Sequence, residues 1–88
     1  MLHAFKGWID RRREIRRRWQ VDARRLVVQD PTGAYYEAQR RAARARANGA
    51  GDEFLHWAKT AAEVARIAPT SEMDISVVEK IIDEELRR

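Results

Sequence analysis

Arginine side chains are the residues of this chain with the clearest capacity for chemistry. Eight arginines lie between Arg11 and Arg25, in the stretch DRRREIRRRWQVDARR. A guanidinium group stays charged and donates paired hydrogen bonds to phosphate or carboxylate oxygens. A GC-rich genome would also produce an arginine excess, so composition alone does not indicate a binding role. The spacing of the arginines is therefore more informative than their number.

No group of side chains has the pattern of an active site or a metal centre. The chain has no cysteine, and its two histidines, His3 and His56, are far apart. His56 has Glu53 three residues before it, which gives too few ligands for zinc, and we expect a surface histidine. Ser71 and Ser76 have the positions of helix-terminus residues. We therefore expect no enzymatic activity, no bound metal and no cofactor.

Several carboxylates near the C-terminus belong to one continuous helical pattern. They lack the glycine-containing turn of a calcium-binding loop. Paired carboxylates in catalysis also need different environments, and a wet helix face gives them only one. We therefore interpret this group as a solvated acidic face, formed by Glu79, Asp83, Glu84 and Glu85.

The arginines of the first helix are phased together with an apolar stripe. In a heptad that starts at Phe5, the a and d positions carry Phe5, Trp8, Ile15, Trp19 and Leu26. Arg12 and Asp22 interrupt this core-facing stripe. A second, basic stripe follows the f and g positions beside it, where arginine stems can cover the core edge while their charges stay in water. Its members are Arg11, Arg17, Arg18, Arg24 and Arg25.

Turn signals divide the chain into four predicted helices and no strands. Asp30-Pro31-Thr32-Gly33 and Asn48-Gly49-Ala50-Gly51 separate the first three, and Pro69 ends the third. We expect Asp52 to cap the third helix, and Thr70 or Ser71 to cap the fourth. The predicted helices cover approximately residues 4–28, 32–47, 52–68 and 72–87.

These elements predict a single all-α domain, a small four-helix antiparallel array with a long basic amphipathic N-terminal helix. The third helix is the most apolar, so we expect it to be central and to bury Trp57. The second helix has an alanine face that would let a neighbour approach closely. Residues 1–46 carry 13 Lys and Arg against 5 Asp and Glu, whereas residues 47–88 carry 5 against 9. The acidic fourth helix is therefore the expected partner of the basic first helix.

The function that these patterns favour is that of a non-enzymatic adaptor, regulator or accessory subunit. It would bind an acidic protein surface through Arg11, Arg17, Arg18, Arg24 and Arg25, with Trp8 as an anchor and with Arg40 and Arg44 extending the patch. Phosphate contacts with a nucleic acid are the alternative. No aromatic residues alternate with the arginines in an exposed stacking pattern, so binding to single-stranded nucleic acid has less support.

Two further expectations concern the surroundings of the protein. The N-terminal apolar residues followed by arginines are also compatible, with less support, with binding to an anionic membrane surface. No apolar run approaches the ~20 residues of a membrane-spanning helix, and the start has no secretory signal pattern, so we expect a cytoplasmic protein. The small core and the segregation of charge favour a homodimer or a complex with a host protein.

Overall fold

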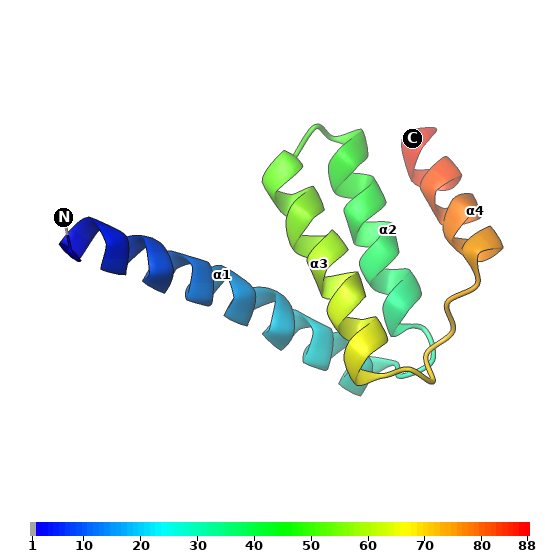
Figure 1. The fold of residues 1–88 in the computed structure, drawn as a ribbon. Coiled ribbons are helices and arrows are strands. Elements are labelled where there is room, and N and C mark those ends of the chain that lie inside the picture. The colour runs from blue at the N-terminus through cyan, green and yellow to red at the C-terminus, as the bar shows by residue number, and fades with distance from the viewer. Residues whose placement is uncertain (1) are drawn as a thin grey trace.

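The computed structural model describes residues 2–88, with side chains from Lys6 onward. It contains four helices: α1 (Leu2–Gln29), α2 (Ala34–Ala47), α3 (Gly51–Ile67) and α4 (Ile75–Leu86). No strand occurs in this part of the chain, which confirms the predicted all-α class. Phe5 and His3, which the sequence analysis singled out, lie outside the described side chains. Figure 1 shows α2 and α3 side by side, with α1 crossing them obliquely and α4 on the far side of α2.

Local chemistry explains most of the helix ends. After α1, the Asp30 carboxylate accepts a hydrogen bond from the Gly33 N–H at 3.1 Å and so closes the turn that contains Pro31. After α2, Gly49 has a φ of 71°, a left-handed conformation that costs glycine little. These two turns lie where the sequence predicts them.

Two predicted caps are wrong. The fourth helix begins at Ile75 and is capped by Asp74, whose carboxylate accepts from the backbone N–H of Ser76 at 2.9 Å. Ser71 instead donates its hydroxyl to the carbonyl of Pro31. Asp52 lies inside the first turn of α3, which has no side-chain cap. Its charge still favours the positive end of the helix dipole.

The core lies where α1, α2 and α3 meet, and it consists largely of alanine. Only two of its fully buried side chains, Leu26 and Val64, are larger than a methyl group. Alanines on two facing helices allow a close approach of their backbones. The remaining buried members of the cluster are Ala23, Ala34, Ala38, Ala61 and Ala68. Trp57 is partly buried and packs against this cluster, so its predicted burial holds only in part.

Helix α2, and not α3, is the central helix. It contacts α1, α3 and α4, whereas α3 contacts α1 and α2 alone. The predicted central position of the third helix is therefore wrong. The reason is that small side chains cover α2 on more than one side, so that neighbours pack on both flanks. The buried alanines of α2 are Ala34, Ala38, Ala42, Ala43 and Ala45.

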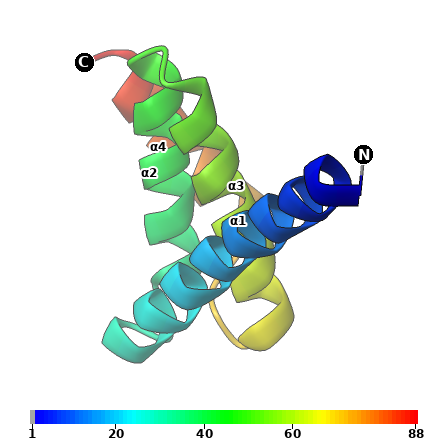
Figure 2. The same ribbon diagram turned by 90° about the vertical axis from the view of Figure 1, so that its left-hand side faces the viewer.

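The predicted pairing of the first and fourth helices is also wrong. Helix α4 contacts α2, and no contact joins it to the described part of α1. The linker after α3 is tied to the turn between α1 and α2, because the Glu72 N–H donates to the Thr32 carbonyl at 3.0 Å. The Asp74 N–H donates to the Tyr36 hydroxyl at 2.9 Å. These bonds direct α4 onto the side of α2 that faces away from α1 (Figures 1 and 2).

The N-terminal half of α1 projects beyond the other helices, as both views show (Figures 1 and 2). The whole chain measures 48 × 29 × 18 Å along its principal axes. On the projecting half, the side chains of Trp8 and Ile15 are 54% and 45% exposed. The apolar stripe of α1 is thus covered by the fold only toward its C-terminal end. None of the described helices has both the length and the apolar character needed to cross a membrane.

Candidate interaction surface

The basic stripe of α1 is exposed in the structure. Arg11, Arg17 and Arg24 lie six and seven residues apart, and all three side chains are exposed. Positions seven apart return to nearly the same side of a helix, so Arg17 and Arg24 share one face. Within the described residues, no carboxylate lies within ion-pairing distance of five arginines of this helix: Arg11, Arg13, Arg16, Arg17 and Arg24.

Two other members of the stripe pair with acidic residues of the same helix. Arg18 lies 3.2 Å from Glu14, and Arg25 lies 3.0 Å from Asp22. Both arginines remain mostly exposed. An exposed ion pair of this kind contributes only ~0.2–1 kcal/mol. Both guanidinium groups can therefore exchange these contacts for an external carboxylate or phosphate at little cost.

Trp8 stands beside Arg12 on the projecting half of α1. The Arg12 guanidinium lies 4.8 Å from the centroid of the Trp8 ring, within the range of a cation–π contact. Arg12 interrupts the predicted apolar stripe, and its position over Trp8 explains how the fold accommodates the charge there. No other helix covers this segment, so the arginine remains in water.

Arg40 and Arg44 do not extend the surface of α1. Arg40 lies 3.1 Å from Glu85 and 3.2 Å from Glu84, and Arg44 lies 3.3 Å from Glu85. The structure therefore turns both arginines toward α4, which α1 does not contact. Their predicted position alongside the first helix is wrong, because the acidic helix packs on α2 and pairs with them instead.

Glu85 is the centre of this ion-pair group. Its side chain is 1% exposed. Hydrogen bonding from Arg44, then from Arg40, outweighs desolvation and holds the pKa of Glu85 below its ordinary value. In the same contacts, the hydrogen bond to Glu85 raises the pKa of Arg40. Two residues of the predicted solvated acidic face, Glu84 and Glu85, thus join α4 to α2, and Glu85 is buried.

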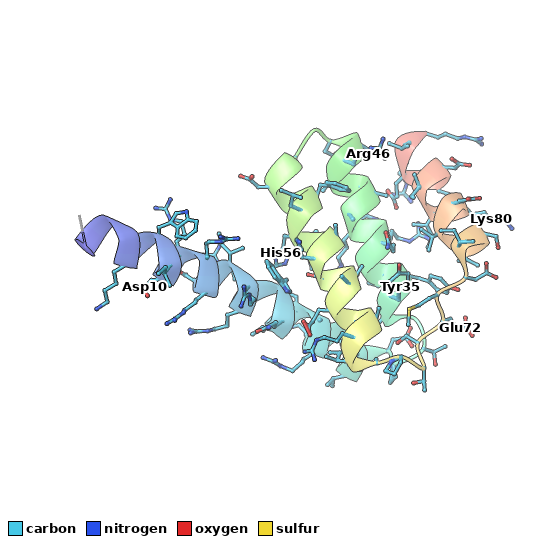
Figure 3. All side chains as sticks on the ribbon, in the orientation of Figure 1. Asp10, Tyr35, Arg46, His56, Glu72 and Lys80 are labelled. Carbon is cyan, nitrogen blue, oxygen red and sulfur yellow. The ribbon has the colours of Figure 1, made fainter. Side chains whose placement is uncertain are left out.

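His56 also has a different environment from the one that the sequence predicts. Its side chain is 23% exposed, and its Nε2 atom lies 2.7 Å from Oδ2 of Asp22 on α1. A carboxylate accepts hydrogen bonds, so Nε2 is the donor. Figure 3 shows His56 on the side of α3 that faces α1. The second interruption of the apolar stripe, Asp22, is therefore a polar contact between helices that sequence reasoning missed.

An apolar hollow opens between α1 and α3 beside this contact. It has a volume of about 420 Å³. A shallower hollow of about 370 Å³ lies on the other side of His56 and includes Arg17 and Arg18. The larger hollow is lined by Ile15, Arg18, Trp19, Asp52, Leu55, His56 and Lys59.

The described side chains contain no group of three or more His, Cys, Asp or Glu that could hold a metal ion. The surface features are therefore arginines, exposed apolar side chains and the hollow between two helices. Comparison of the chain with protein-family models, with curated proteins and with solved structures finds no match.

Proposed function

We propose that this protein is a small non-enzymatic interaction protein, and that α1 binds an acidic surface of a partner protein through its exposed arginines. The observation that carries this proposal is the set of α1 arginines that have no carboxylate within reach in the described chain. Arginine recognises carboxylates through two parallel hydrogen bonds, which gives such a contact both strength and orientation.

The exposed apolar residues on the same half-helix favour a protein as the partner. Trp8 and Ile15 lie close to Arg11 and Arg18 in the heptad, and both are about half exposed. Tryptophan and arginine are the residue types most enriched among those that dominate binding energy at protein interfaces. A nucleic-acid backbone would engage the arginines and leave these apolar side chains in water.

Affinity purification of the tagged chain from its native host, with and without nuclease, tests this proposal. The decisive variant carries Arg11→Glu, Arg17→Glu and Arg24→Glu. A matched control carries Arg46→Glu, Lys80→Glu and Arg87→Glu, at exposed positions outside α1. Each triple substitution changes the net charge from +4 to −2. We expect a nuclease-resistant protein partner that the α1 variant loses and the control retains.

The salt dependence of binding separates the two main partner classes. Binding to phosphates should weaken steeply, with a log–log slope of roughly −0.9 per neutralised phosphate on duplex DNA. A protein interface with apolar anchors should retain much of its affinity at high salt. Nuclease-sensitive capture with a steep salt slope would replace the proposal with nucleic-acid binding. Retention only by vesicles with anionic lipids would replace it with membrane binding.

A further inference from the structure

Two surfaces of this chain have exposed apolar side chains and opposite charge. One is the hollow between α1 and α3, and the other is the outer face of α4. The helices that form them are separated by α2, because α1 and α3 lie on one side of it and α4 lies on the other (Figures 1 and 2). Because α4 contacts α2 and not α1, the two surfaces cannot meet within one chain.

The hollow is lined by both apolar and basic side chains. Ile15 and Leu55 are 45% and 57% exposed, and Trp19 also belongs to the lining. Arg18 and Lys59 are its basic members. The Lys59 ammonium group lies 5.9 Å from the Trp19 ring centroid. Asp52 is a single opposing charge, so the surroundings of the hollow remain positive overall.

The outer face of α4 is apolar and acidic. Val78, Ile81 and Glu85 are buried, on the side of α4 that packs on α2. On one flank of this packed side, Ile75 and Leu86 are 70% and 48% exposed. Ile82 lies between them in the helical repeat and is partly buried.

Two carboxylates accompany these apolar residues of α4. Glu79 and Asp83 follow at helical spacing beside Ile75 and Ile82, and both are exposed. Neither has a cation within ion-pairing distance in the described structure. The outer face of α4 therefore presents three apolar side chains and two free carboxylates.

The charge of the hollow favours an acidic helix as its occupant. Pairing between two copies of α1 is disfavoured, because this helix carries nine Lys and Arg against three Asp and Glu and would repel itself.

We propose that the outer face of α4 in one copy packs into the hollow between α1 and α3 of a second copy. Ile75, Ile82 and Leu86 then cover Ile15, Trp19 and Leu55. Glu79 and Asp83 face Arg18 and Lys59. Each copy offers one hollow and one α4 on opposite sides of α2, so the contact is head to tail. This contact goes beyond the proposed function, which uses the outward arginines Arg11, Arg17 and Arg24.

Sedimentation velocity of the full chain over a wide range of concentrations tests this contact. We expect the average mass of the unaltered chain to rise with concentration. A hollow variant carries Arg18→Glu and Lys59→Glu, and an α4 variant carries Glu79→Lys and Asp83→Lys. Each variant alone should associate at least about tenfold more weakly, because like charges then face each other. A mixture of the two should regain association, since reversed surfaces complement each other.

Two further variants make the test specific. The charge control carries Arg13→Glu and Arg24→Glu, which change the net charge by the same amount as the hollow variant. Both positions are exposed and line neither hollow, so self-association should be unchanged. Leu55→Ala removes an exposed side chain without a change of charge. This substitution should weaken self-association. Circular dichroism checks that every variant is folded.

Three outcomes would overturn the head-to-tail contact. They are a monomer at every concentration, equal weakening by the Arg13 and Arg24 control, and no recovery in the mixture. None of these results affects the capture of an acidic partner by the outward arginines, which the triple reversal at Arg11, Arg17 and Arg24 tests separately. The two proposals share Ile15, but separate sets of charge reversals test them.

Discussion

The imidazole of His56 and the carboxylate of Asp22, 34 residues apart, form a hydrogen bond of 2.7 Å between α3 and α1. The Asp22 carboxylate also lies 3.0 Å from Arg25 on its own helix. On the other side, the His56 ring meets Trp57 edge to face, with centroids 4.8 Å apart. A polar pair is thus built into the apolar side of α1, next to the hollow. It sets the relative position of α1 and α3 at the point where they begin to diverge.

A double-mutant cycle with Asp22→Ala and His56→Ala should reveal this coupling. Removing Asp22 leaves His56 partly buried without this partner, whereas removing His56 leaves Asp22 paired with Arg25 alone. The two losses should therefore not add. We expect a coupling of about 1–2 kcal/mol in the free energy of unfolding, measured by urea denaturation. The control cycle uses Glu14 and Arg18, an exposed pair on one helix, where about 0.3–0.5 kcal/mol is expected. Equal coupling in both cycles would contradict the interhelical role of Asp22.

Glu85 should make the stability of the fold sensitive to acid. Its pKa is lowered in the folded chain, chiefly by hydrogen bonding from Arg44. The stability that it contributes is therefore fully present above the ordinary glutamate pKa, and it is lost as the pH falls through the lower folded value. We expect Glu85→Gln to lower the melting temperature at neutral pH, and this difference should shrink in acid. Thermal melts from neutral pH to below pH 4 would measure both curves.

Two comparisons isolate the contribution of Glu85. The pKa of Asp74 is also lowered, by hydrogen bonds from the Ser76 hydroxyl and backbone, so part of the acid loss is common to both proteins. Glu79→Gln removes the same charge from an exposed position of α4, and its melting curve should follow that of the unaltered chain. If Glu85→Gln retains the full acid dependence, another carboxylate is responsible for it.

The helices and the apolar stripe of α1 could be predicted from the sequence, because the spacing of side chains defines which face is apolar. Spacing does not define what covers that face. Leu26 is buried in the core, whereas Ile15, on the same stripe, remains 45% exposed because α1 extends past α3. The projection of the N-terminal half therefore depends on the crossing angle between helices, which the heptad pattern does not contain.

The partner of the acidic helix could not be predicted from charge alone. Both α1 and α2 are rich in arginine, so Glu84 and Glu85 had two possible basic neighbours. The linker decides between them, through the bonds from Ser71 to Pro31 and from Glu72 to Thr32. The sequence position of Ser71 predicts a helix cap, so its role as a link between distant turns could not be predicted. Arg40 and Arg44 thus became internal partners of α4.

Trp57 should contribute less to stability than a tryptophan in a closed core. Its ring packs against the core cluster on one side and lies 4.7 Å from the Arg41 guanidinium. We expect Trp57→Ala to lower the free energy of unfolding by about 2–3 kcal/mol, below the ~3–5 kcal/mol of a fully buried aromatic. Trp8→Ala, on the projecting half of α1, should change it by less than about 0.5 kcal/mol. Urea denaturation compares the two, and equal losses would contradict the observed packing.

The alanine core should tolerate added volume poorly. Ala38 is 0% exposed and belongs to the cluster where α1, α2 and α3 meet. Ala38→Leu adds three carbon atoms there and should force the helices apart, at a cost of about 1–3 kcal/mol. Ala62→Leu makes the same change at an exposed position of α3 and should be nearly neutral, because leucine and alanine have similar helix propensities. Thermal melts measure both variants. If Ala38→Leu were as stable as Ala62→Leu, α2 could not pack as closely against its neighbours as the structure shows.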